Sequence, residues 1–120
     1  MKFSKEYIKE CDCEEIRNLE ETKIGNWHSV DGEIILHFAN GVQFVPTDAK
    51  VIWLPTGDQL DEEIVKAMQD IDNYRIGFSK NDCFVSIFDY GLEKYYHRFE
   101  NKNPLIAKIK LLKQLLKEKG

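Results

Sequence analysis

The residues with the chemistry best suited to a site form an aromatic and cationic group in the second half of the chain. They are Tyr74, Arg75, Tyr95, Tyr96 and Arg98. Tyrosine and arginine are enriched at binding hot spots, and a guanidinium can stack on a base or pair with a phosphate. Aromatic residues are also ordinary strand residues that pair across a sheet. The sequence therefore offers a binding surface here, with plain sheet packing as the alternative.

A metal site is a second interpretation to weigh. Cys11 and Cys13 could ligate a metal ion together with His28 or His37. Structural zinc sites usually combine C-x₂₋₄-C pairs at fixed spacing. On a helix, two side chains separated by one residue diverge by about 200°. We therefore expect packing cysteines, no metal and no cofactor.

The sequence signals for a catalytic site are equally weak. Cys83 and His97 could form a nucleophile and base on neighbouring strands, but Cys83 lies in an apolar strand, where thiols are usually inert. Carboxylates cluster at residues 12–15, 61–63 and 70–72, and the helix dipole accounts for the acidic residues in first turns. The sequence predicts no catalytic residue, and we expect a protein that is not an enzyme.

Composition limits the class of protein. The chain has 120 residues, of which 42% are hydrophobic, which predicts a single α+β domain over residues 1–120. No apolar run approaches the roughly 18 residues of a membrane span, and the charged N-terminus does not resemble a signal peptide. An odd number of cysteines, three, favours a reducing cytoplasm over a disulfide scaffold.

The charge is unevenly distributed along the chain. Residues 1–72 carry 16 acidic and 7 basic side chains, whereas residues 73–120 carry 5 and 10, and the chain as a whole has a net charge of −4. A nucleic-acid-binding domain normally has a strong positive balance. We therefore expect no direct nucleic-acid contact. Two solvated regions of opposite sign are the alternative to a charged partner surface.

The first half reads as helix followed by short strands. Ser4 is placed to cap a helix that runs to Cys11. Asp12 is placed to cap a second short helix. Three strands are then predicted, divided by two dipeptides that favour tight turns, Asp31-Gly32 and Asn40-Gly41. The predicted strands are Trp27–Val30, Glu33–Ala39 and Val42–Val45. A connection follows, with one further apolar stretch at Val51–Leu54.

The second half repeats the order of helix, strands and helix. Asp58 is placed to cap a helix that reaches about Asp72. The strands that follow are Tyr74–Lys80, Cys83–Tyr90 and Leu92–Phe99, of which the second is apolar on both faces and suits the interior of a sheet. The complete order, α-βββ-α-βββ-α with antiparallel meanders, is typical of an α+β fold.

The last predicted helix starts with Asn103 as its cap and Pro104 at its first position. One apolar stripe contains Leu105, Ile109, Leu112 and Leu116. A solvated face with lysines beside the stripe is the default interpretation. Because Leu111 and Leu115 widen the apolar stripe, a homodimer contact through this helix is the alternative.

The string Trp53-Leu54-Pro55-Thr56-Gly57-Asp58-Gln59-Leu60-Asp61-Glu62 resembles a W-L-P-x-x-D-Q-L-x-E pattern of small uncharacterised proteins from phages and prophages of Gram-positive bacteria. The resemblance implies a phage-type origin and an α-β-α sandwich-like second half. It implies no catalytic residue. The motif itself is structural, since Pro55 stops a strand and Asp58 starts a helix.

These observations lead to an expected function. The chain is expected to be a phage-type accessory protein that binds a host protein stoichiometrically, without membrane contact. The resemblance to phage proteins implies, as the most concrete partner, a nucleic-acid-binding effector of antiviral defence such as a CRISPR effector. The acidic first half would be the natural face for such a basic target. The alternative is a small-ligand protein that sequesters a nucleotide signal between the aromatic and arginine side chains.

Overall fold

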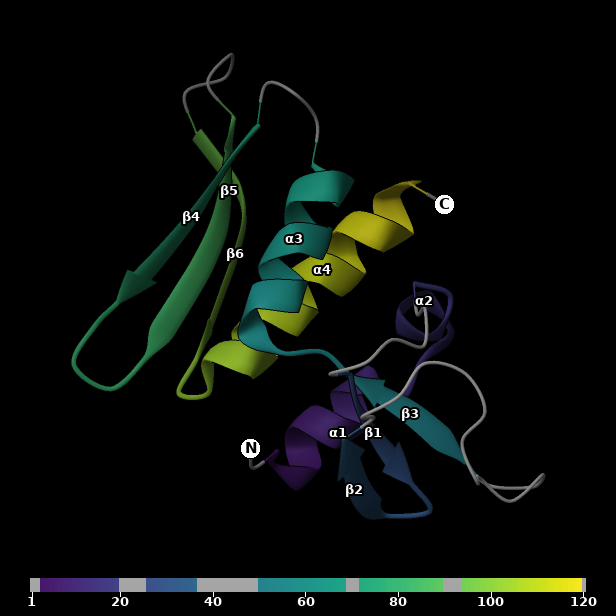
Figure 1. Cartoon of the computed structure of the whole chain (residues 1–120). Helices are drawn as coiled ribbons and strands as arrows, with labels where there is room; N and C mark the ends of the chain where they lie inside the picture. The colour runs from purple at the N-terminus through teal and green to yellow at the C-terminus, as the bar shows by residue number, and fades with distance from the viewer. Residues whose placement is uncertain (1–2, 20–25, 37–49, 69–71, 90–93, 120) are drawn as a thin grey trace. The chain divides into compact units, whose positions relative to one another are not determined.

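The computed structural model describes residues 3–19, 26–36, 50–68, 72–89 and 94–119 (Figure 1). Over these residues the chain is an α+β protein with two three-stranded antiparallel sheets, which confirms the predicted fold class. The chain divides into two compact units, Met1–Thr56 and Gly57–Gly120, and each is described by itself. That the whole chain is one domain stays a prediction.

The first unit opens with two short helices, α1 (Lys5–Cys11) and α2 (Glu14–Arg17). Ser4 caps α1 as predicted, because its hydroxyl accepts a hydrogen bond from the Tyr7 backbone N–H at 3.1 Å. The predicted cap of the second helix is wrong. Cys13 precedes α2, and Asp12 ends α1 instead, where its carboxylate pairs with Lys50 at 2.6 Å.

The first sheet consists of β1 (Trp27–Val30), β2 (Glu33–Leu36) and β3 (Val51–Leu54) in the order β2-β1-β3. Among the described strands β1 is central and pairs with both neighbours. The third strand comes from the apolar stretch that the sequence placed in a connection. The predicted strand Val42–Val45 and the turn Asn40-Gly41 lie outside the described residues.

The hairpin between β1 and β2 has the turn that its sequence predicts. Asp31 and Gly32 have φ angles of 49° and 90°, the left-handed region that this dipeptide tolerates. The Asp31 side chain also accepts a hydrogen bond from the Lys50 backbone N–H at 2.9 Å. The turn therefore fixes the start of β3 as well as the register of β1 and β2.

An aromatic group and one buried hydrogen bond hold α1 in the first unit. The rings of Phe3 and Tyr7 stack, and Phe3 meets Trp27 edge-on. The Tyr7 hydroxyl donates a hydrogen bond to the Pro55 carbonyl oxygen at 2.6 Å. Burial raises the pKa of this hydroxyl far above its ordinary value, and nearby Cys11 adds to the shift. This bond joins α1 to the segment after β3.

The second unit contains α3 (Gly57–Ala67), β4 (Asp72–Phe78), β5 (Cys83–Asp89), β6 (Lys94–Asn101) and α4 (Pro104–Lys119). Its sheet has the order β4-β5-β6, the meander that was predicted, with the doubly apolar strand at the centre. The predicted helix end near Asp72 is wrong, because Asp72 already begins β4.

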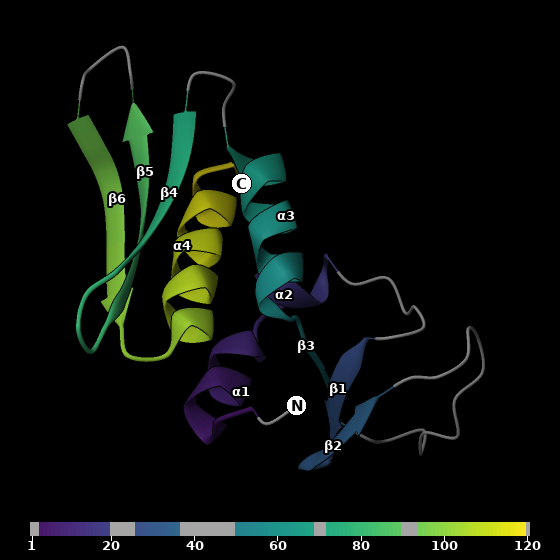
Figure 2. The same cartoon turned by 60° about the vertical axis from the view of Figure 1, so that its left-hand side comes forward.

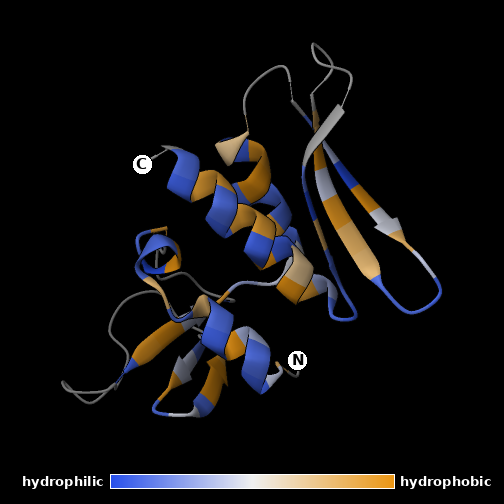
Figure 3. Cartoon of the chain, turned by 180° about the vertical axis from the view of Figure 1, so that it is seen from behind, coloured by the Kyte–Doolittle hydropathy of each residue, from blue (hydrophilic) through white to orange (hydrophobic). Residues whose placement is uncertain are grey.

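The two helices of this unit cover one face of its sheet. α4 packs against β5 and β6, and α3 packs against α4 (Figure 2). The covered face, called the inner face here, includes Cys83, Val85 and Ile87, which are at most 1% exposed. Hydrophobic and hydrophilic residues alternate in blocks along α4 (Figure 3), as expected for a helix with a buried face and a solvated one.

The start of α4 follows its sequence signals. The Asn103 side chain accepts a hydrogen bond from the Leu105 backbone N–H at 3.0 Å, and Pro104 is the first helical residue. Leu111 and Leu115, which favoured a homodimer contact, are 0% and 4% exposed within the chain. The dimer stays a prediction, and these two leucines belong to the core of the chain.

Candidate binding site

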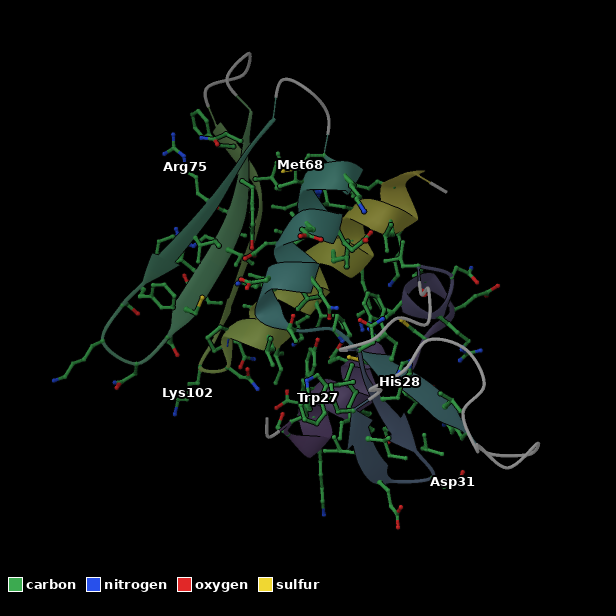
Figure 4. The ribbon with its side chains drawn as sticks, in the orientation of Figure 1. Trp27, His28, Asp31, Met68, Arg75 and Lys102 are labelled. Carbon is green, nitrogen blue, oxygen red and sulfur yellow. The ribbon has the colours of Figure 1, made fainter. Side chains whose placement is uncertain are left out.

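Strand alternation separates the residues that the sequence grouped as a binding surface. Tyr74 and Arg75 are neighbours in β4, so their side chains point to opposite faces of the sheet. Tyr74 lies opposite Ile87 and shares its inner face, whereas Arg75 lies opposite Ser86 on the other face. Figure 4 shows Arg75 on the side of the sheet that faces away from α3 and α4.

The other three predicted residues lie in β6. Arg98 is opposite Ser86 and thus shares a face with Arg75. Tyr95 is paired with Phe88, and a register shift at this point leaves Tyr96 as the extra residue of a β-bulge. The side chains of these two tyrosines lie outside the described part of the structure.

The face opposite the helices, called the outer face here, carries the remaining candidates in register. Its described members are Asn73, Arg75 and Gly77 of β4, Phe84, Ser86 and Phe88 of β5, and Arg98 and Glu100 of β6. One row across the three strands reads Arg75, Ser86, Arg98. Because directly opposite residues on one face have Cβ atoms about 4.5–5.5 Å apart, the two arginines flank the serine.

Each arginine of this row lies over a phenylalanine of the central strand. The guanidinium carbon of Arg75 is 4.8 Å from the centre of the Phe88 ring, and that of Arg98 is 4.3 Å from the Phe84 ring. Both distances are within the range of a cation–π interaction. The Arg98 guanidinium also donates to one carboxylate oxygen of Glu100, at 2.9 Å from Nε and 2.8 Å from Nη2.

Gly77 makes room for this arrangement. A Cβ atom built at this position would lie 2.0 Å from the tip of the Phe84 ring. The ring therefore lies directly against the backbone of β4. Any residue other than glycine at position 77 would fill the space that the ring occupies. With the ring flat against the sheet, Arg98 reaches it from the opposite strand.

Tyr74 has a structural role on the inner face. Its hydroxyl donates a hydrogen bond to the Asp61 carboxylate of α3 at 2.8 Å, and Lys108 of α4 lies 3.1 Å from the same carboxylate. Burial and the hydrogen bond to Asp61 raise the pKa of Tyr74 well above its ordinary value. The three residues join a strand and two helices, and the sequence alone gave no sign that Asp61 and Lys108 meet.

The cysteine and histidine candidates do not form a reactive pair. Cys83 is opposite Asn101, whereas His97 is opposite Ile87, four residues farther along β5. Burial raises the pKa of the Cys83 thiol, which keeps it in the unreactive protonated form. The His97 Nε2 atom lies 2.6 Å from a carboxylate oxygen of Glu118, so it joins β6 to α4.

The metal candidates also lie apart from any recognisable ligand set. Cys11 ends α1, Cys13 precedes α2, and both are free thiols. His28 is buried in β1, and His37 lies outside the described residues. Among the residues that the structure places, no group of three or more histidine, cysteine, aspartate or glutamate side chains could hold a metal ion.

An open hollow in the first unit was not expected from the sequence. It has a volume of about 470 Å³, and its lining includes Lys5, Ile8, Lys9 and Ile52. Both lysines are exposed, and the carboxylates of Glu6 and Asp12 also line the hollow. The outer face of the second sheet, with paired cations and stacked rings, is the more developed site.

Comparison of the chain with protein-family models, curated proteins and solved structures finds no match. None of the helices described has both the length and the apolar character needed to cross a membrane. The outer face of the second sheet carries two exposed cations, two half-buried aromatic rings and one buried hydroxyl.

Proposed function

We propose that this chain is a non-enzymatic protein that binds one partner protein stoichiometrically through the outer face of its second sheet. One observation supports this most directly. Arg75 and Arg98 are held in a single row across the sheet, each over a phenylalanine ring. Arginine and aromatic side chains are the types enriched at the centres of protein interfaces.

The stacking favours a protein partner over a small ligand. A guanidinium over a ring is partly ordered before the partner arrives, so less side-chain entropy is lost on binding. It also occupies the ring face on which a nucleotide base would stack. A nucleotide signal stays the second candidate, because two guanidiniums in one row could pair with its phosphates.

The nature of the partner is a further part of the proposal. The resemblance of Trp53–Glu62 to phage and prophage proteins supports a host protein in the bacterial cytoplasm as the target. The excess of acidic residues in 1–72 suits a nucleic-acid-binding target, whose basic surface is complementary. Inhibition of a defence effector such as a CRISPR effector is the most concrete form of this proposal.

The test is capture of partners from the lysate of a Gram-positive bacterium by the full chain and by an Arg75→Ala/Arg98→Ala variant. We expect one host protein to be retained at equimolar ratio by the wild type and lost by the variant. Lys102→Ala is the matched control, because it removes an exposed cation that follows β6 and lies outside the row of Arg75, Ser86 and Arg98 (Figure 4). Equal capture by all three chains would exclude this face.

The nucleotide alternative has its own measurement. A ligand that binds only the folded state raises the melting temperature, so a panel of linear and cyclic nucleotides should shift the wild type if the second candidate is right. The shift should disappear in the double arginine variant. No shift with any nucleotide, together with equimolar capture of a host protein, favours the protein partner.

A further inference from the structure

A buried hydroxyl on the outer face has no hydrogen-bond partner among the described residues. The Oγ atom of Ser86 is fully buried and is not bonded. Leaving such a group unsatisfied destabilises the folded chain, and each case in a folded protein calls for an explanation. An apolar residue of similar size, such as alanine, would fill the position without that cost.

The neighbours of Ser86 indicate what the hydroxyl could bind. Arg75 and Arg98 flank it across the sheet, on the same face. Their guanidiniums extend toward Phe88 and Phe84, and a guanidinium has no acceptor atom to offer the hydroxyl. A hydroxyl between two guanidiniums can donate a hydrogen bond only to an incoming acceptor, and an anion satisfies all three groups.

The same face already holds one carboxylate. Glu100 accepts two hydrogen bonds from Arg98 through a single oxygen atom. The side chains of Arg98 and Glu100 are 48% and 52% exposed, so an external carboxylate can reach and replace this contact. Exposed pairs of this kind contribute little to stability, and exchanging one carboxylate for another is therefore inexpensive in free energy.

We infer that Arg75, Ser86 and Arg98 form a subsite for a carboxylate carried by an acidic segment of the partner protein. The inference rests on the proposed function for the idea that a protein docks on this face, and it adds the chemistry of the docking segment. The arginines turn from the rings toward the carboxylate, and the Ser86 hydroxyl donates to it. The partner then presents a basic surface to residues 1–72 and an acidic segment to this sheet.

The test is calorimetric titration of the full chain with a hexaglutamate peptide at low salt. Wild type should bind, and Ser86→Ala should bind about tenfold more weakly, because one hydrogen bond to a charged group is lost. The same variant should be as stable as wild type or more stable in urea, since it removes an unsatisfied hydroxyl. Arg75→Ala and Arg98→Ala should each weaken binding by tenfold or more.

Two further variants separate the subsite from general charge attraction. Glu100→Gln should bind the peptide several-fold more tightly, because the competing carboxylate on Arg98 is removed. Lys102→Ala should lower the affinity by less than about twofold, the long-range effect of one screened charge. A structural role for Ser86 alone would produce neither the gain in Glu100→Gln nor the loss in Ser86→Ala.

Three results would overturn the inference. They are no binding of hexaglutamate by the wild type, equal binding by wild type and Ser86→Ala, and tighter binding of inorganic phosphate than of the peptide. The last result would assign the row to phosphate. In each case, capture of a host protein that still depends on Arg75 and Arg98 would leave the proposed function standing.

Discussion

The ring of Phe84 occupies the space that a side chain at residue 77 would fill, so that Gly77 and Phe84 form one packing unit across β4 and β5. The distance of 2.0 Å from a built Cβ atom to the ring is far below any real contact. The glycine is required by a close approach and not by its backbone angle. The position of Phe84 in turn determines where Arg98 stacks.

Gly77→Ala should therefore destabilise the chain, although alanine is usually preferred to glycine in a strand. We expect a loss of about 1–3 kcal/mol in the free energy of unfolding, as for overpacked positions, measured by urea denaturation. Gly57→Ala is the control, because a Cβ atom there would meet only ordinary contacts of 3.4 Å and more. In a Phe84→Ala background, where the ring is absent, Gly77→Ala should cost little stability. An equal loss in both backgrounds would contradict the packing account.

Asp61→Ala should destabilise the second unit. The substitution removes the acceptor of Tyr74 and leaves the Lys108 ammonium, whose side chain is 13% exposed, without this carboxylate. We expect a loss of about 1–3 kcal/mol, measured by denaturation. Glu62→Ala, at an exposed neighbour on the same helix, should change stability by less than about 0.5 kcal/mol. If the two variants behave alike, the three-residue contact is not stabilising.

Stability should fall at alkaline pH because of two buried tyrosines. The pKa values of Tyr7 and Tyr74 are raised above their ordinary value, which is about 10 in an unfolded chain. Their stabilising contribution is complete below about pH 10 and is lost as the pH rises further, since the unfolded chain then releases protons that the folded chain retains.

Tyr7→Phe and Tyr74→Phe should each reduce this loss. The measurement is the difference between the unfolding free energies at pH 8 and pH 11, compared with the same difference in wild type. Both variants also lose a hydrogen bond, but that loss is present at pH 8 and cancels in the comparison. An unchanged difference in both variants would show that lysine titration alone causes the alkaline loss.

Asn103→Ala should weaken the start of α4. The side chain accepts the Leu105 N–H, and removing such a cap costs about 1 kcal/mol, with a range of about 0.5–2. Denaturation and the helical circular dichroism signal both test this. Lys102→Ala, one residue earlier in the chain, serves as the control and should have no measurable effect on either.

Local signals were read correctly from the sequence, because their causes lie within a few residues. The Asp31-Gly32 turn and the Ser4 and Asn103 caps depend on backbone preferences of single positions. The central position of β5 followed from its apolar residues on both faces. The prediction that Asp12 caps the second helix was wrong. The two helices follow each other closely, and Asp12 is the C-terminal cap of the first.

Long-range relations were missed. The apolar run Val51–Leu54 is too short for its periodicity to distinguish a strand from a connection. Its pairing with β1 is a long-range contact, which local sequence does not determine. The contact between Asp61 and Lys108 spans 47 residues. For the candidate site, the alternation of strand residues could have separated Tyr74 from Arg75, but the row with Ser86 required the register of two strand pairs.

The packing of α3 on α4 has a consequence for the order of folding. These helices are the first and last elements of the second unit, and the whole meander lies between them. Closing a loop of this size costs chain entropy, and this cost is offset only once α3 and α4 are in contact. Until α4 is in place, Leu60 and Ile64 of α3, both fully buried in the finished unit, remain uncovered. A chain truncated within the meander would therefore keep α3 with its apolar side chains exposed. Chaperones and proteases would recognise it as incompletely folded.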